Sequence, residues 1–201
     1  YIMKRTLTLL SIFLFISVLF GQPTFTESAI STSADGARAV YAADVDGDGD
    51  MDVLSASSND DKVRWYENDG SESFTQHVIS TSAENTSSVH AADVDGDGDM
   101  DVLSASSGDN KIAWYENDGS ESFTEHAIST SADGAYSVYA ADVDGDGDMD
   151  VLSASKNDNK IAWYENDGSE SFTEHIISTS ADGTYSVHAA DVDGDGDMDV
   201  L

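Results

Sequence analysis

The chain has 201 residues, no cysteine, and 40 acidic residues against eight basic ones, which gives a net charge of −32. A surface of this charge repels nucleic acid and anionic membranes and favours cations, so nucleic-acid binding is excluded. Without cysteine there are no disulfides, and stability has to come from a repeated core, from bound metal, or from both. Regularly spaced aromatic and β-branched residues argue against the disorder that acidic composition alone would suggest.

Residues 1–21 have the pattern of a secretory signal peptide. Lys4 and Arg5 precede an apolar run of about 15 residues that ends at Phe20 and is followed by Gly-Gln-Pro. The run is shorter than the roughly 20 residues of a membrane-spanning helix; a retained N-terminal anchor is the alternative interpretation. We therefore expect a mature chain, residues 22–201, that has no membrane span and is secreted, extracellular or held at the cell surface. With six basic and 40 acidic residues, its net charge is −34.

The mature chain is a tandem repeat with a period of 49 residues. The string Asp-Val-Asp-Gly-Asp-Gly-Asp-Met-Asp occurs four times, at residues 44–52, 93–101, 142–150 and 191–199. Repeats of about 40 to 50 residues are typical of propellers and arrays, because one unit cannot bury its own apolar face.

Each repeat is expected to form four short β-strands. In the third repeat they are predicted over residues 137–143, 150–155, 160–165 and 172–178, where valine, isoleucine and aromatic residues are concentrated. The Asp-rich string and two turns separate them, and the Asn-Asp-Gly of the second turn is a strong hairpin signal. Because no segment of the mature chain has the period of an amphipathic helix, the predicted fold class is all-β.

Four antiparallel strands per repeat correspond to one blade of a β-propeller. The 180 residues from 22 to 201, divided by the period of 49, give about 3.7 four-stranded blades. The alternative is an open array of small sheets or a β-solenoid, but solenoid coils usually repeat every 20 to 30 residues or so. Residues 25–30 resemble the fourth strand of a preceding blade.

The Asp-rich strings have the ligand pattern of a calcium-binding loop. Numbered from the first Asp, side-chain oxygens fall at positions 1, 3, 5 and 9, position 7 offers its backbone carbonyl, and glycine at position 6 permits a sharp turn. Oxygen ligands select Ca²⁺, and the absence of His and Cys from the loops argues against zinc and copper. About one Ca²⁺ per loop is expected. The predicted metal-binding residues are Asp44, Asp46, Asp48, Asp50, Asp52, Asp93, Asp95, Asp97, Asp99, Asp101, Asp142, Asp144, Asp146, Asp148, Asp150, Asp191, Asp193, Asp195, Asp197 and Asp199.

Two other interpretations of the loops are less favoured. An EF-hand needs an acidic residue at position 12, where this chain has Ser55, Ser104 and Ser153, and the flanking segments are predicted strands rather than helices. A solvated acidic turn without metal is the simplest alternative. The string occurs in four copies, each with glycine at position 6, and this favours a metal-binding loop.

A strand, then Asp-x-Asp-x-Asp-Gly-Asp-x-Asp, then Val-Leu-Ser-Ala-Ser resembles the FG-GAP/VCBS repeat, the blade unit of integrin-α-like propellers. The four loops match the calcium loop of that family residue by residue. The resemblance implies a seven-bladed propeller, of which this chain would be a fragment, with Ca²⁺ in hairpin loops on one face. The chain lacks a Phe-Gly…Gly-Ala-Pro segment and its repeat is shorter than the integrin one. It is therefore more similar to the bacterial secreted type, and integrin-type ligand binding is not implied.

The recurrent Trp-Tyr pairs, at Trp65, Trp114 and Trp163, have two interpretations. Exposed rings would stack on sugars, as in lectins similar to this family, whereas packing between blades would place them in the core. Packing is favoured, because a residue present in every copy usually serves the shared core. His90 shares its repeat position with Tyr41, which also indicates packing or hydrogen bonding rather than catalysis.

No Gly-x-Ser-x-Gly nucleophile elbow occurs, and calcium explains the acidic clusters, so the segment is not expected to be an enzyme. The sequence predicts a secreted calcium-binding β-propeller with a structural or binding role, whose partners are calcium and an extracellular protein or glycan. Two alternatives stay open: a lectin-like, carbohydrate-binding propeller, and the accessory propeller of a secreted enzyme whose catalytic domain lies beyond Leu201.

Overall fold

The computed structural model describes residues 27–201, so the predicted signal peptide, 1–21, lies outside the described residues. Each complete repeat forms a four-stranded antiparallel sheet whose strands pair in chain order, and the last repeat forms a two-stranded one. The strands are β1 (Ala37–Ala43), β2 (Asp52–Ser57), β3 (Lys62–Asn68) and β4 (Phe74–Ser80); β5 (Thr86–Ala92), β6 (Asp101–Ser106), β7 (Lys111–Asn117) and β8 (Phe123–Ser129); β9 (Ala135–Ala141), β10 (Asp150–Ser155), β11 (Lys160–Asn166) and β12 (Phe172–Ser178); and β13 (Ala189–Ala190) and β14 (Asp199–Val200).

The predicted strands of the third repeat agree closely with these bounds. The second and fourth are confirmed to the residue, and the third extends one residue further, to Asn166. The first begins and ends two residues earlier than predicted, since the Val143 N–H donates to Asp150 Oδ2, at 2.9 Å, instead of to a neighbouring strand. Residues 27–30, part of the predicted strand at 25–30, form no strand.

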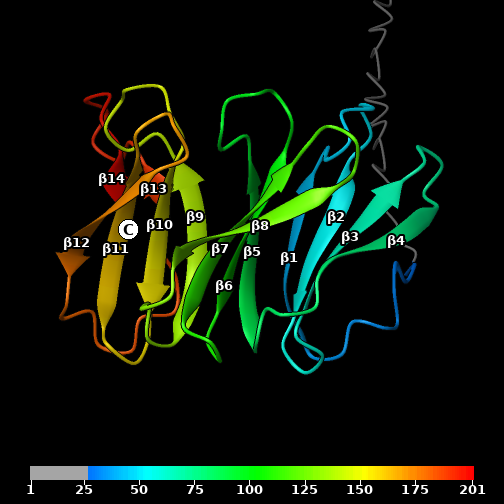
Figure 1. The fold of residues 1–201 in the computed structure, drawn as a ribbon, viewed down its shortest axis with the longest axis horizontal. Helices are drawn as coiled ribbons and strands as arrows, with labels where there is room; N and C mark the ends of the chain where they lie inside the picture. The colour runs from blue at the N-terminus through cyan, green and yellow to red at the C-terminus, as the bar shows by residue number, and fades with distance from the viewer. Residues whose placement is uncertain (1–26) are drawn as a thin grey trace, which may run out of the picture.

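The three complete sheets lie side by side as blades of a propeller (Figure 1). The first strand of the second sheet, β5, contacts both β1 and β9, whereas the fourth strands of the second and third sheets are the most exposed of those sheets. The all-β propeller fold is therefore confirmed, with three complete blades and the first two strands of a fourth. Residues 27–201 contain no helix that could cross a membrane.

Side chains packed between blades form the core. Leu54 and Trp65 of the first sheet share one cluster of buried residues with Val102 and Tyr115 of the second, and the second and third sheets repeat the arrangement. Because successive side chains of a strand point to opposite faces, the Trp and Tyr of β7 pack against different neighbouring blades. Trp65 and Trp114 are 0% and 1% exposed, so the packing interpretation is confirmed for them and neither ring is free to stack on a sugar. Trp163 packs in the third cluster and is partly exposed.

The shared His/Tyr position forms a ladder of rings across the first strands of the blades. The centroid of His90 lies 4.5 Å from that of Tyr41 and 4.7 Å from that of Tyr139, and Tyr139 lies 4.3 Å from His188. The expected packing role of these residues is therefore confirmed.

Candidate metal centre

The four Asp-rich loops join the first and second strands of their repeats and lie at one end of the molecule, the upper end in Figure 1. Since each sheet is antiparallel, the turns between third and fourth strands lie at the same end, and the linkers between blades lie at the opposite end. The fold therefore gathers all twenty predicted ligand residues on one face.

Backbone amides orient the carboxylates within each loop. In the first loop Asp46 Oδ1 accepts the N–H of Asp48 at 3.1 Å, and Asp48 Oδ1 accepts that of Asp50 at 2.8 Å. Asp44 Oδ2 accepts the N–H of Gly49 at 3.0 Å. Gly49 has φ = +97°, the left-handed conformation that glycine adopts without strain, so the turn predicted at position 6 is confirmed.

Three carboxylates converge in each loop, with one oxygen of each lying within 4.8 Å of the others. Positions 1 and 3 belong to every cluster. The third member is position 5 in the first and third loops and position 9 in the second and fourth. Oxygens bound to one Ca²⁺ at 2.3–2.6 Å are at most about 5 Å apart, so these oxygens fit a calcium ion. The clusters are Asp44, Asp46 and Asp48; Asp93, Asp95 and Asp101; Asp142, Asp144 and Asp146; and Asp191, Asp193 and Asp199.

The loop carboxylates lack protein cations. None of the ion pairs formed within residues 27–201 includes an aspartate of these loops. Asp44 Oδ1 is buried and accepts no hydrogen bond. Burial raises the pKa of Asp46 and of Asp95, and the neighbouring carboxylates raise both further. Desolvation and repulsion of this kind disfavour the anions, and a bound dication would offset both.

The aspartate at position 9 has a second, structural role. Asp101 is fully buried; its Oδ2 accepts the Val94 N–H at 2.9 Å and its Oδ1 accepts the Asn117 N–H at 2.8 Å. The carboxylate thus connects the loop to the end of β7. Burial raises its pKa to about 6, although these two amides oppose the shift. Asp52 and Asp150 make the equivalent hydrogen bonds.

The aspartate at position 7 belongs to none of the four clusters. The Asp50 side chain lies against Gly70 in the turn between β3 and β4, so that a Cβ at Gly70 would approach Asp50 Cγ to 3.1 Å. Asp99 and Asp148 lie against Gly119 and Gly168 in the same way. The backbone-carbonyl role of position 7 stays a prediction.

Asparagines at the ends of the third strands join neighbouring loops, a contact that the sequence did not predict. Asn117 Nδ2 donates to Val45 O in the first loop at 3.1 Å, and Asn166 Nδ2 donates to Val94 O in the second at 2.9 Å. Both asparagines are buried. Asparagine occurs at this position in every complete repeat, which could have marked it as a structural residue. The residues around it, however, indicate only a turn.

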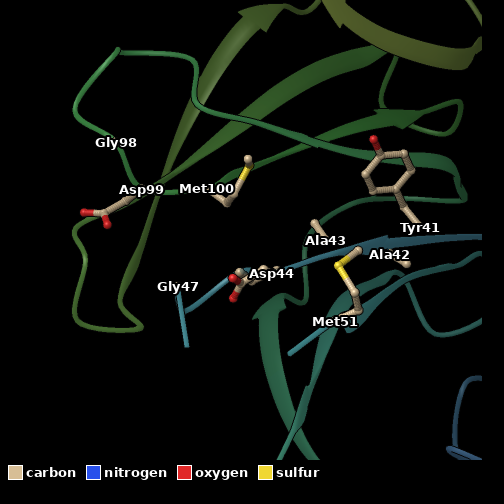
Figure 2. Close-up of a pocket in the computed structure, with 10 residues that line it drawn as sticks. Tyr41, Ala42, Ala43, Asp44, Gly47, Met51, Gly98, Asp99 and Met100 are labelled. Carbon is tan, nitrogen blue, oxygen red and sulfur yellow. The ribbon is translucent and has the colours of Figure 1, made fainter. Parts of the chain in front are cut away.

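A cleft of about 470 Å³ separates the first two loops (Figure 2). Tyr41, Met51 and Met100 contribute apolar surface to it, and Asp44 and Asp99 contribute carboxylates. A smaller cleft between the third and fourth loops is lined by the equivalent Met198. The cleft is part of the face that carries the Asp-rich loops, and it is not the Trp-Tyr surface of the lectin-like alternative.

Comparison with known sequences finds the FG-GAP-like repeat in four overlapping matches, over residues 12–55, 44–104, 93–153 and 142–201. No curated protein matches the chain.

Among the solved structures that are similar to this fold are two larger proteins. One is a lectin of Agrocybe aegerita, described as specifically recognising non-reducing terminal N-acetylglucosamine, with a TM-score of 0.56 and 18% identity; the match covers 81% of this chain and 46% of the lectin. The other is the Vibrio cholerae biofilm matrix protein Bap1, with a TM-score of 0.51 and 20% identity; the match covers 88% of this chain and 30% of Bap1. The chain therefore spans less than half the length of either protein, and at these identities the similarity is one of fold.

Proposed function

The chain belongs to the FG-GAP-like repeat family, and from this premise we propose that it is a secreted, calcium-stabilised β-propeller module with a structural or binding role outside the cytoplasm. The observation that carries the proposal is the recurrence, in all four loops, of three carboxylate oxygens within 4.8 Å of one another without a protein cation to pair with them.

Calcium would be held by the side chains at positions 1, 3, 5 and 9 and would supply the positive charge that the loops lack. The amides that already orient Asp46 and Asp48 reduce the cost of ordering the ligands when the ion binds. Ion binding would fix the connection between the first two strands of each blade, so folding and calcium binding would be coupled.

The signal-peptide pattern of residues 1–21 and the absence of cysteine-based stabilisation support export of a metal-stabilised chain. The similarity of the fold to a lectin and to a biofilm matrix protein supports a binding or structural role towards an extracellular glycan or protein. We propose no catalytic role for residues 22–201, because their acidic clusters are repeated in every copy, whereas an active site normally departs from the repeat.

Isothermal titration of the metal-free protein with CaCl₂ tests this proposal. The expected result is about one Ca²⁺ per loop with dissociation constants around 10⁻⁴ to 10⁻³ M, as in other extracellular modules, and weaker binding of Mg²⁺. The double substitution Asp95→Asn and Asp97→Asn should remove one site. Asp182→Asn, at an exposed aspartate outside the loops, is the control for lost charge and should leave the stoichiometry unchanged. Absence of calcium binding, or equal loss of binding in both variants, would contradict the proposal.

A further inference from the structure

The face opposite the calcium loops carries a pocket of about 290 Å³, formed where the linkers between blades meet the lower ends of the first strands. Three consecutive blades contribute to it. Arg38 comes from the first blade, Asn85 and Ser107 from the second, and Tyr136 and Lys156 from the third.

This pocket contains two cationic side chains that form no ion pair, although the Asp133 carboxylate accepts a hydrogen bond from Asn157 at its wall, at 3.1 Å. Residues 27–201 include six Lys and Arg, and four of them pair with Asp or Glu. The two that form no ion pair in this part of the chain are Arg38 and Lys156; both are exposed and both line the pocket. In a chain with a net charge of −32, two such cations in one pocket make it the place on the described surface that best suits an anion.

The pocket also lies where the repeats differ from one another. Arg38 has Ser87, Tyr136 and Tyr185 as its equivalents in the other repeats, and Lys156 has Ser58 and Ser107. The Asp-rich strings, by contrast, are identical in all four copies. Positions shared by every repeat serve the common core, so residues that differ between repeats and meet in one pocket are candidates for an individual site.

Local backbone geometry explains how these side chains reach the pocket. The pairing of β1 with β2 shifts register between Ala37 and Ala39, which leaves Arg38 as the extra residue of a β-bulge. Tyr136 is the extra residue at the equivalent bulge of β9. Bulges redirect side chains away from the regular alternation of a strand, and neither residue belongs to the buried clusters between the blades.

Aromatic rings contact Lys156, the second cation of the pocket. Lys156 Nζ lies 4.5 Å from the centre of the Tyr185 ring, and Tyr185 packs edge to face on Tyr136 with their centroids 4.8 Å apart. Asn85, Ser107 and Asn157 add amide and hydroxyl groups to the pocket wall. A guanidinium pairs with a carboxylate through two parallel hydrogen bonds, while amides, hydroxyls and a tyrosine ring suit the hydroxyls and apolar face of a sugar.

We propose that this pocket binds a carboxylate-bearing sugar, as found in the uronic-acid units of anionic polysaccharides. The inference names a ligand class for the binding role proposed above and rests on that role, but none of its residues belongs to a calcium loop. A calcium measurement therefore tests the loops alone, and a sugar titration tests the opposite face.

Nuclear magnetic resonance titration of the full chain with galacturonate tests the proposal, at fixed calcium concentration and about 0.15 M salt, where long-range repulsion from the acidic surface is largely screened. Saturable shifts are expected at the amides of Arg38, Tyr136 and Lys156. Galactose, which lacks the carboxylate, should produce none at the same concentration, and sulfate should bind about tenfold more weakly, since it lacks the sugar contacts.

Arg38→Ser and Lys156→Ser should each weaken galacturonate binding by about tenfold, the loss expected for one charge-assisted hydrogen bond. Both variants place in the pocket the residue found at that position in another repeat, so folding is expected to be retained. Lys62→Ser removes the same charge at a residue paired with Asp60 and should leave binding unchanged. Equal binding of galactose, equal binding of sulfate, or unchanged affinity in Arg38→Ser and Lys156→Ser would each overturn the proposal.

Discussion

His90 lies between the rings of Tyr41 and Tyr139 on the first strands of the blades. It is buried there, and burial lowers the pH at which its side chain takes up a proton. Burial, with a smaller contribution from the charge of His188, lowers the pKa of His90 from 6.5 to about 4. The unfolded chain therefore takes up a proton near pH 6.5, whereas the folded chain takes it up near pH 4. The contribution of neutral His90 to stability is complete above about pH 6.5 and is lost as the pH falls towards 4.

The variant His90→Tyr isolates this effect, because tyrosine already occupies the equivalent positions 41 and 139. Between pH 7 and pH 4 the wild type should lose about 3 kcal/mol more of its free energy of unfolding than the variant does. Urea denaturation at several pH values measures the difference, and the carboxylates common to both proteins cancel. Parallel loss of stability in the two proteins would show that His90 is not buried in its neutral form.

At the scale of single elements, the turn between the third and fourth strands of each blade is fixed by the preceding Asp-rich loop. Gly119 has φ = +71°, and a Cβ there would overlap the Asp99 carboxylate. Glycine is thus required for two reasons, its left-handed backbone and its missing side chain. By contrast, Gly183 has φ = +62°, and a Cβ added there would meet no other part of the protein within 4 Å, so only the backbone requires glycine at that position.

Gly119→Ala should therefore destabilise the protein more than Gly183→Ala. A left-handed alanine costs about 1–2 kcal/mol at either position, and displacement of the Asp99 carboxylate should add up to about 1 kcal/mol at Gly119. Urea unfolding of the two variants measures both values. Equal losses of stability would mean that the contact between Asp99 and the turn contributes nothing.

The same turn shows what the sequence does and does not reveal. Local patterns predicted the strands and the Asn-Asp-Gly hairpin, because turn chemistry and β-propensity act within a few residues. The position of Val143 in the loop rather than in the strand depends on one side-chain hydrogen bond from its amide to Asp150, which a strand pattern does not contain. Likewise, the ligand pattern predicted which loops gather carboxylates, but the burial of Asp101 and the placement of Asp99 against Gly119 arise from contacts between segments distant in the sequence.

At the scale of the whole molecule, stability is expected to depend on contacts between neighbouring blades, as in other repeat proteins. Asn117 bridges the first and second blades through Val45 O, and it also donates to Met100 O within its own blade, at 3.2 Å. Asn68, its equivalent in the first blade, donates to Met51 O at 3.1 Å. Asn117 therefore makes a contact between blades that Asn68 does not make, and it is also the more buried of the two.

Asn117→Ala should cost about 1–2 kcal/mol more of the free energy of unfolding than Asn68→Ala, because it leaves the Val45 carbonyl without its partner. Chemical denaturation measured side by side gives the difference directly. If the two variants lose equal stability, the asparagine bridge does not couple the blades.

The pocket at the lower face was beyond prediction from the sequence, although Arg38 and Lys156 were visible as departures from the repeat. They lie 118 positions apart in the chain, and only the arrangement of three blades brings them to one pocket. The blade repeat itself was predictable, because its period and turn signals recur four times.

The central claim is that calcium in the Asp-rich loops stabilises the propeller, and a thermal melt in calcium and in EGTA tests it most directly. At a calcium concentration of 100 times the dissociation constant, each occupied loop adds about 2.7 kcal/mol, and each kcal/mol raises the Tm of a chain of this size by about 2–4 °C. We expect a Tm at least about 5 °C higher in calcium than in EGTA, with a smaller effect of magnesium. An identical Tm in calcium and in EGTA would contradict the claim.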